Sequence, residues 1–252
     1  MQLEGKRALV TGGSGDIGSA IARALAAAGA RVAISYAGFV EGARRTVAAL
    51  DAAKATGAFA IQLDQRDPDG IERARDETLE RHGGLDILVN NAAWNIGIPF
   101  PDLETLDPET WNRVLETNLL GPYLLARAFA PGLAAGGGGH IVNIASTAGL
   151  APGGSSIAYA CSKAGFIHLT RCLAVALAPS VQVNCIAPGL VEGTRMAARL
   201  PGEAARRARD QAVLGRVGDA EDIARQTVAF CTTGSVTGQV IAVDGGMPGA
   251  MR

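Results

Sequence analysis

The 252-residue sequence has no long hydrophobic run, and no stretch approaches the roughly 20 apolar residues of a membrane-spanning helix. Aromatic residues make up only 4% of the chain, and the net charge is −1. A nucleic-acid partner or an anionic membrane would favour a basic face, which this charge balance does not indicate. We therefore expect no nucleic-acid partner and no membrane association.

The chain is also poor in metal-binding and disulfide-forming patterns. Its three histidines show no ligand spacing, so we expect no metal centre. The first ten residues lead directly into an apparent strand and leave no room for a signal peptide. Scattered thiols without a CxxC pair fit a reducing cytoplasm, where we place the protein. These thiols belong to Cys161, Cys172, Cys185 and Cys231.

Short, almost continuously apolar runs alternate with longer helical patterns. Such runs are typical of strands buried on both faces, and the alternation predicts right-handed crossovers in a parallel sheet. The sequence therefore predicts an α/β fold: one Rossmann-type, doubly wound, seven-stranded parallel sheet with helices on both faces, in a single domain over 1–252. We predict strands at 7–12, 31–36, 58–64, 85–92, 139–146, 181–188 and 238–246, and helices that include 17–29, 68–83, 108–130 and 156–178.

The stretch TGGSGDIG, at 11–18, joins the first strand to the first helix. Backbone N–H groups at a helix N-terminus attract phosphate, and glycines let it approach closely. A plain strand–helix turn is the alternative interpretation. Asp16 stands where a glycine is expected, and its carboxylate should repel a pyrophosphate. Asp tolerates the left-handed region, so we expect that conformation, with the carboxylate turned towards a ribose hydroxyl or the first helical N–H groups.

Tyr159 and Lys163 are four residues apart in YACSK, on one face of a predicted helix. An ammonium beside a phenol lowers the phenol pKa towards the range of acid–base catalysis, although a surface Tyr over a Lys stem is the alternative. Ser146 ends a predicted strand and is able to orient a substrate oxygen, or it is an ordinary strand-end serine. Asn118 lies in mid-helix, where it holds a water, supports a backbone bend or faces solvent.

These motifs together resemble the short-chain dehydrogenase/reductase family, in its branch of single-domain enzymes similar to 3-oxoacyl-carrier-protein reductases. The resemblance covers about residues 5–246. It rests on TGGSGDIG, NNAA at 90–93, Asn118, Ser146, YxxxK at 159–163, PG at 188–189 and TGQVIAVDGG at 237–246. It implies hydride transfer between a nicotinamide dinucleotide and a secondary alcohol or ketone. An epimerase or dehydratase, and a catalytically silent nucleotide sensor or scaffold, are the alternatives.

The resemblance implies a role for each matching residue. Tyr159 is the expected acid/base, Ser146 holds the substrate oxygen, Lys163 binds the ribose and lowers the Tyr159 pKa, and Asn118 holds a relay water. Thr194 stands one position later than the family pattern places its nicotinamide-contacting threonine. Besides Tyr159 and Lys163, the expected coenzyme-binding residues are Gly12, Ser14, Gly15, Asp16, Ile17, Gly18, Tyr36, Asp64, Gln65, Asn91, Ala92, Pro188, Gly189, Val191 and Thr194.

The choice between NADP and NAD depends on the end of the second strand. An acidic residue there binds the ribose 2′-hydroxyl and rejects a 2′-phosphate, but the position is Tyr36. Family members that use NADP often carry Arg in the glycine turn or just after this strand, where Gly15 and Ala37 stand. Arg44 or Arg45 reaches a phosphate only if the second helix is suitably oriented. The missing acid favours NADP over NAD.

For the alcohol or ketone substrate we expect contacts from Trp94, Ala148 and Pro152. The segment 193–215 has glycine at both ends and is a candidate lid. Its arginines, Arg195 among them, either attract an acidic substrate or form a solvated helix face, which is the commoner arrangement. The helices at about 108–133 and 155–178 resemble those that build tetramers in this family, so a homotetramer or homodimer is expected.

Overall fold

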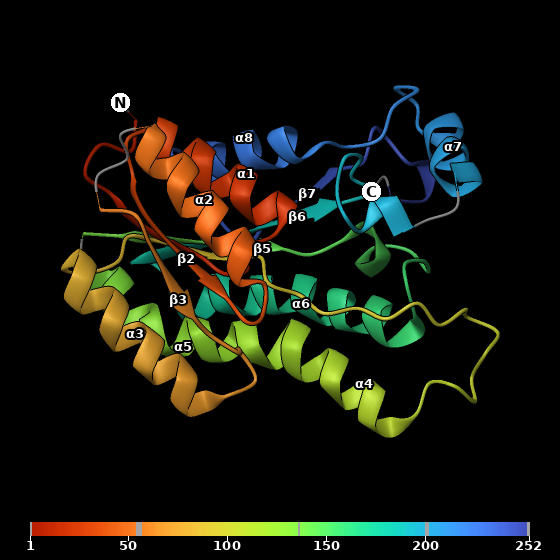
Figure 1. The fold of residues 1–252 in the computed structure, drawn as a ribbon, viewed down its shortest axis with the longest axis horizontal. Helices are drawn as coiled ribbons and strands as arrows, with labels where there is room; N and C mark the ends of the chain where they lie inside the picture. Colours follow the sequence, from red (N-terminus) through yellow and green to blue (C-terminus); the bar gives the residue numbers. More distant parts are fainter. Residues whose placement is uncertain (1, 54–56, 136, 200–201, 251–252) are drawn as a thin grey trace.

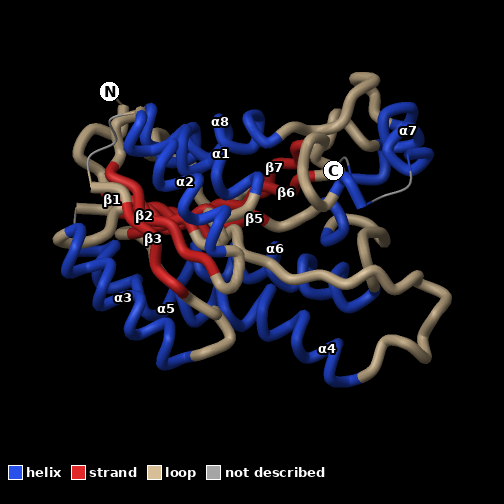
Figure 2. The backbone as a smooth tube through the Cα atoms, viewed as in Figure 1, coloured by secondary structure: helices blue, strands red, loops and turns tan. Residues whose placement is uncertain are grey.

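A seven-stranded parallel sheet forms the centre of the computed structural model, which describes residues 2–53, 57–135, 137–199 and 202–250 (Figure 2). The predicted sheet is confirmed, and the runs 31–36 and 181–188 match their strands, whereas the other strands are shorter than predicted by up to three residues at an end. The strands are β1 (Arg7–Val10), β2 (Arg31–Tyr36), β3 (Phe59–Gln62), β4 (Ile87–Asn90), β5 (Gly139–Ile144), β6 (Val181–Pro188) and β7 (Val240–Val243).

Helices cover both faces of the sheet (Figure 1). One face packs against α1 (Asp16–Ala27), α2 (Val40–Ala52) and α8 (Ala220–Cys231). The other face packs against α3 (Pro68–His82), α5 (Gly121–Ala135) and α6 (Ile157–Ala176). The remaining α-helices are α4 (Pro108–Leu115) and α7 (Gly202–Gln211). None of the helices among the described residues is long and apolar enough to span a membrane.

The spatial order of the strands is β3-β2-β1-β4-β5-β6-β7, and every neighbouring pair is parallel. The order reverses between β1 and β4, because the chain builds outward first on one side and then on the other. In such sheets, ligands bind beyond the carboxyl ends of the strands at this reversal. The loops after β1 and β4 therefore mark the place of the site.

The predicted helix at 108–130 extends to Ala135 and has an irregular centre. A π-helical turn, η1 (Glu116–Leu120), joins α4 to α5. π-turns inside α-helices occur often at functional sites. Asn118 lies in this turn, with its side chain buried.

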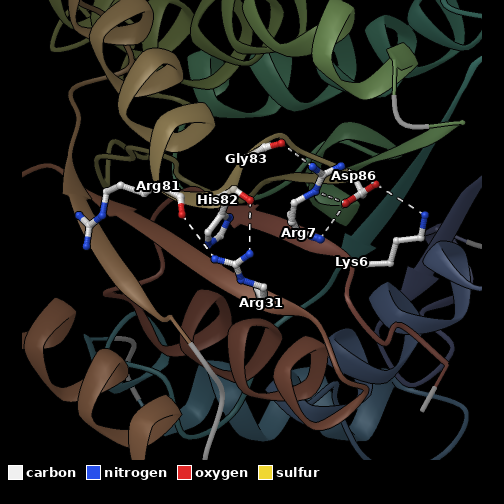
Figure 3. Close-up of polar contacts among 7 residues, drawn as sticks. All are labelled: Lys6, Arg7, Arg31, Arg81, His82, Gly83 and Asp86. Carbon is white, nitrogen blue, oxygen red and sulfur yellow. Dashed lines mark hydrogen bonds and ion pairs between the residues drawn. The ribbon is translucent and has the colours of Figure 1, made fainter.

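The amino-terminal edge of the sheet carries a network of charged groups (Figure 3). Asp86 accepts hydrogen bonds from the Arg7 main-chain N–H, at 2.9 Å, and from Arg7 Nε, at 2.7 Å. Lys6 Nζ lies 3.6 Å from the same carboxylate. Arg7 Nη1 also donates to the carbonyl of Gly83, which follows α3. This network joins β1 to the start of β4 and satisfies a carbonyl at the end of α3.

Candidate active site

The glycine turn packs directly against the loop that follows β4. Gly12 has a φ of +64°, and a Cβ atom on it would lie 2.9 Å from Ala92 Cα. A Cβ atom on Gly18 would lie 2.5 Å from the Gly12 carbonyl oxygen and 2.7 Å from Asn91 Nδ2. All three distances are too short for real contacts, so the turn and the loop can come this close only with glycine at these positions.

Thr11 and Asn91 hold the turn and the loop together. The Thr11 hydroxyl accepts hydrogen bonds from the main-chain N–H groups of Asn91 and Ala92, each at 3.0 Å. Asn91 Nδ2 donates to the Thr11 carbonyl at 2.9 Å. Thr11 is a site residue that was not predicted, although its position as the first residue of TGGSGDIG, next to the strand end, indicates such a role.

The N-terminus of α1 fits a bound phosphate. Its cap residue, Gly15, has no side chain to satisfy the first-turn N–H groups, and no side-chain cap is present. Ser14, Gly15 and Ile17 are all partly exposed around this end of the helix. A helix N-terminus with free N–H groups and close glycine backbone attracts an anion. The residues present therefore suit the pyrophosphate of a dinucleotide coenzyme.

The predicted conformation of Asp16 is wrong. Asp16 is the first residue of α1 and has helical backbone geometry, whereas the positive φ belongs to Gly12. The carboxylate does not turn to the first helical N–H groups either. It accepts the main-chain N–H of Arg195 at 2.8 Å, and Arg195 Nε lies 3.5 Å from the same oxygen. The neighbouring cation therefore offsets the charge that would repel a phosphate.

Ser146 and Tyr159 meet at the carboxyl edge of the sheet. Ser146 follows β5 and caps the short helix η2 (Thr147–Gly149), where its Oγ accepts the Ala148 N–H at 3.2 Å. Tyr159 lies in the first turn of α6 and is 9% exposed. Burial raises the pKa of the Tyr159 phenol, and a hydrogen bond with Ser146 opposes that rise. The two side chains thus lie near each other, and their roles in catalysis stay predictions.

Lys163 lies one helical turn after Tyr159 and is buried. Its Nζ donates to the Ile144 carbonyl at 3.0 Å and lies 5.7 Å from the centroid of the Tyr159 ring. Burial lowers the pKa of Lys163 to about 8. The shift of the Tyr159 pKa arises from burial and Ser146, so the lowering of that pKa by Lys163 stays a prediction.

Asn118 supports the loop after β4. Its Oδ1 accepts the Trp94 N–H at 2.8 Å, while its Nδ2 donates to the Trp94 carbonyl at 2.9 Å and to Ser162 Oγ at 3.1 Å. Both amide protons are therefore used within the protein. Of the alternatives raised from the sequence, solvent exposure is excluded, and the side chain supports the backbone. A relay water held by this residue stays a prediction.

Gln65 and Asp64 follow β3 and differ in burial. Gln65 is 4% exposed, and its Nε2 donates to the Ala92 and Thr117 carbonyls. It therefore links the loop after β4 to the helix of Asn118. Asp64 is exposed and is held by Arg66, whose Nη2 donates to it at 2.7 Å, and this hydrogen bond lowers the Asp64 pKa. Contact of Asp64 with adenine stays a prediction.

The segment after β6 closes another side of the site. Pro188 is buried, and a Cβ atom on Gly189 would lie 2.7 Å from Asp244 Cβ. Val191 is buried as well. Thr194 Oγ1 donates to the Val191 carbonyl at 2.9 Å and accepts the Ala197 N–H at 3.1 Å. The Thr194 hydroxyl therefore stabilises the approach to helix η3 (Ala197–Arg199).

Two of the three expected substrate contacts lie beside Tyr159. Ala148 belongs to one apolar cluster with Tyr159, and Trp94 packs against that cluster. Pro152 is exposed on the loop after η2. Tyr36 is partly buried at the end of β2, on the coenzyme side of the sheet. The part of the chain that the structure describes contains no group of three or more His, Cys, Asp or Glu residues arranged to hold a metal ion.

Comparison with known proteins agrees with this geometry. Residues 13–248 match the family described as enoyl-(acyl carrier protein) reductase. A ketoacyl reductase of the granaticin polyketide synthase from Streptomyces violaceoruber is 39% identical over 95% of this chain and 94% of its own. A short-chain dehydrogenase from Burkholderia cenocepacia, solved in complex with NADP, has a TM-score of 0.89 at 36% identity, covering 98% of this chain and 99% of its own. A 3-ketoacyl-(acyl-carrier-protein) reductase from Brucella melitensis, complexed with NADH, has a TM-score of 0.88 at 29% identity, with coverages of 97% and 99%.

The fold and the site define a nicotinamide-dependent oxidoreductase with a Rossmann-type sheet. The chain belongs to the short-chain dehydrogenase/reductase family. Its activity is hydride transfer between a nicotinamide dinucleotide and a secondary alcohol or ketone. The comparisons give no support to the alternative of a catalytically silent sensor or scaffold.

Proposed function

We propose that this protein is an NADP-dependent reductase of 3-oxoacyl thioesters, with Tyr159 as the proton donor. The observation that carries the proposal is that Ser146 lies close enough to Tyr159 to act on the pKa of its phenol, while Lys163 Nζ, one helical turn further on, lies 5.7 Å from the Tyr159 ring centroid. Two hydroxyl groups at one point are suited to a carbonyl oxygen that gains negative charge. When a reduced nicotinamide coenzyme is bound, it supplies the hydride.

Tyr159 is suited to act as a proton donor at neutral pH. Burial raises the pKa of the phenol, so at neutral pH the hydroxyl keeps its proton and is able to donate it. Ser146 orients the same substrate oxygen through its hydroxyl. The same group takes the proton back when the alcohol is oxidised. We assign ketone reduction as the principal reaction because two of the relatives bear ketoacyl reductase names.

Lys163 and Asn118 have supporting roles in this proposal. Lys163 holds the nicotinamide ribose and returns a proton to Tyr159, for which a pKa of about 8 is suitable. Asn118 keeps Trp94 and the β4 loop in place through its three side-chain hydrogen bonds. Both amide protons of Asn118 are already donated within the protein. We therefore propose that the relay water donates to an oxygen acceptor near this turn and receives no hydrogen bond from the Asn118 side chain.

Coenzyme binding is assigned to the glycine turn and the strand ends around it. The residues are those expected from the sequence. Two of them have indirect roles: Gln65 holds the loop at Ala92, and Thr194 holds the backbone at Val191. NADP is preferred over NAD in this proposal because β2 ends at Tyr36, without an acid to hold a free 2′-hydroxyl. The NADP complex of the Burkholderia relative supports this choice, and the NADH complex of the Brucella relative makes it a point to test.

The 3-oxoacyl thioester is proposed because two of the relatives bear ketoacyl reductase names. Trp94 and Ala148 form an apolar wall beside Tyr159 that suits an acyl chain, and Pro152 is assigned to the rim. The test is the oxidation of NADPH by acetoacetyl-coenzyme A, followed at 340 nm. Turnover of the thioester supports the proposal. Oxidation of polyols without any thioester reduction would overturn the substrate assignment.

We further propose that the chain is one domain that acts in the cytoplasm as a homotetramer or homodimer. The four cysteines are free thiols, and two of them, Cys161 and Cys172, are exposed, which suits a reducing compartment. A groove of about 480 Å³ lies between η1 and α6 and has a mainly apolar lining. Leu120 and Tyr123 on it are 47% and 41% exposed. Light scattering of Leu120→Lys against the unaltered protein tests this face, because a charge there should shift the oligomer towards monomer.

A further inference from the structure

Arg195 has no assigned role in catalysis or coenzyme binding, although it lies next to the glycine turn. It belongs to the segment after β6, in the candidate lid, of which positions 200 and 201 lie outside the described residues. Asp16 fixes its backbone through the 2.8 Å hydrogen bond to its N–H. Its guanidinium carbon lies 4.0 Å from the ring centroid of Phe39. A backbone bond at one end and a cation–π contact at the other define where this guanidinium lies.

The guanidinium occupies the space between two strand ends. Phe39 caps α2 and so belongs to the loop after β2. On the other side, Arg195 Nη2 lies 3.8 Å from the place of a Cβ atom on Gly15. In dinucleotide-binding sheets, the ribose 2′ position lies at the end of the second strand, and an arginine nearby accommodates a 2′-phosphate. Neither Ala37 nor Gly15 is able to supply that arginine, but Arg195 places a guanidinium beside both loops.

A second arginine reaches the same ring. Arg45, on α2, has its guanidinium carbon 5.4 Å from the Phe39 centroid. In the described part of the chain, neither Arg45 nor the two Nη atoms of Arg195 makes a hydrogen bond, and Asp16 is the only carboxylate paired with them. Two guanidinium groups on one ring, with an ion pair only between Arg195 and Asp16, leave N–H donors free for a ligand. A phosphate dianion is the complementary group.

We infer that Arg195, with Arg45, binds the 2′-phosphate of NADP, so that the segment after β6 supplies the cation that the β2 loop lacks. Phe39 is the platform on which both guanidinium groups lie, and Asp16 is a positioning residue that holds the Arg195 backbone. The inference rests on the proposed NADP dependence. It also makes the candidate lid part of the coenzyme site, since one residue of it recognises the adenosine end.

The test compares dissociation constants rather than turnover. We would titrate the unaltered protein, Arg195→Gln and Arg45→Gln with NADPH and with NADH, following nicotinamide fluorescence. Arg207→Gln is the matched control, because Arg207 is an exposed arginine of α7 that pairs with Glu203. Arg195→Gln should raise the Kd for NADPH about tenfold or more, while the Kd for NADH changes by less than about twofold, because a charge-assisted bond to the 2′-phosphate is lost.

A second measurement uses coenzyme fragments. The two probes, 2′,5′-ADP and 5′-AMP, differ by the 2′-phosphate, and each is measured as a competitor of bound NADPH. Arg195→Gln should remove the advantage of 2′,5′-ADP, and Arg207→Gln should keep it. Arg195→Lys, which retains a charge but loses the planar fork, should lie between the two. An unchanged melting temperature confirms that each variant is folded.

The outcomes separate this inference from the proposed function. Equal weakening of NADPH and NADH by Arg195→Gln, or no weakening, would overturn the inference, and so would an unchanged preference for 2′,5′-ADP. If these results accompany NADPH-dependent thioester reduction by the unaltered protein, the proposed function stands and the 2′-phosphate assignment alone is wrong. If the unaltered protein binds neither coenzyme, the proposed function fails as well.

Discussion

The same carboxylate–arginine arrangement occurs at both ends of the sheet. At the amino-terminal edge, Asp86 accepts the main-chain N–H of Arg7 at 2.9 Å and its Nε at 2.7 Å (Figure 3). At the carboxyl edge, Asp16 accepts the main-chain N–H of Arg195 at 2.8 Å and lies 3.5 Å from its Nε. The Asp86 side chain is 5% exposed, however, and the Asp16 side chain is 37% exposed.

This difference in exposure indicates that the amino-terminal edge serves the stability of the fold and that the carboxyl edge serves ligand binding. A buried charge that loses its partner lowers the stability of the fold considerably. An exposed ion pair contributes little to that stability. The amino-terminal edge satisfies its charges internally, among Lys6, Arg7 and Asp86. The carboxyl edge leaves helix N–H groups and arginine donors open to a ligand. Substitutions at the two edges should therefore affect different measurements.

The largest expected effect is that of Tyr159→Phe. Removing the phenolic oxygen removes the proposed proton donor, so kcat should fall by about 10³-fold. The Kd for NADPH and the free energy of unfolding should stay near those of the unaltered protein, because the ring and its packing are retained. Steady-state kinetics, fluorescence titration and urea unfolding measure the three quantities. Retention of most of the turnover would contradict the assignment of Tyr159.

At the amino-terminal edge, the largest effect is a pH dependence from His82. His82 is 3% exposed, and burial, together with the charges of Arg31, Arg7 and Arg81, lowers its pKa from 6.5 to about 4. The unfolded chain takes up a proton near pH 6.5, whereas the folded chain does so only near pH 4. The free energy of unfolding should therefore fall as the pH falls through this window, by up to about 3 kcal/mol.

Urea unfolding at several pH values, on the unaltered protein and on His82→Gln, checks this expectation. Gln does not titrate, so the difference in stability between the two proteins should change between pH 6.5 and 4 and be constant above pH 7.5. His140, whose pKa is also lowered by burial, remains in both proteins and cancels in the comparison. A difference that does not depend on pH would show that His82 titrates normally.

Asp86→Asn should reduce the free energy of unfolding by about 2 kcal/mol, because Arg7 and Lys6 lose a nearly buried counter-charge. Glu77→Gln is the control: Glu77 pairs with Arg81, and its side chain is 44% exposed, so the loss should be below about 0.5 kcal/mol. Activity at 25 °C should be unchanged in both variants. Equal losses would mean that burial does not decide the contribution of these pairs.

The smallest effect on stability is expected from replacing aspartate with asparagine at the carboxyl edge, at Asp16. Asp16→Asn keeps an oxygen that accepts the Arg195 N–H and removes only the charge of an exposed pair. The free energy of unfolding should change by less than about 0.5 kcal/mol. A loss as large as that of Asp86→Asn, measured in the same urea experiment, would remove the distinction between the two edges.

Much of the fold could be predicted because buried parallel strands are apolar on both faces. β2 and β6 match their predicted bounds for this reason. The other strands are shorter than predicted because residues at their ends, such as Asn91 and Ser146, leave the strand ladder and form the loops of the site. The π-turn could not be predicted, since 108–130 has a continuous helical pattern and the bulge depends on the contacts of Asn118 with Trp94.

Local geometry could be predicted where a motif fixes it, and was missed where it depends on long-range contacts. The spacing of Tyr159 and Lys163 is sufficient to place both on one face of a helix. The orientation of Asp16 depends instead on Arg195, 179 residues away along the chain. No local pattern indicates this contact, and so the predicted left-handed conformation was wrong. Gln65 was placed correctly after β3, but its inward hydrogen bonds depend on loops from elsewhere in the sequence.

The π-turn at Glu116–Leu120 also has a consequence for insertions and deletions in this helix. A π-turn holds one residue more than the α-helical turn that it replaces. Removing one residue from it would therefore leave a regular α-helix, with Leu125 and Phe129 still buried against the sheet. The amide of Asn118, which bonds to Trp94 and Ser162, would lose its place instead. The extra residue thus serves the loop after β4 and not the packing of α5.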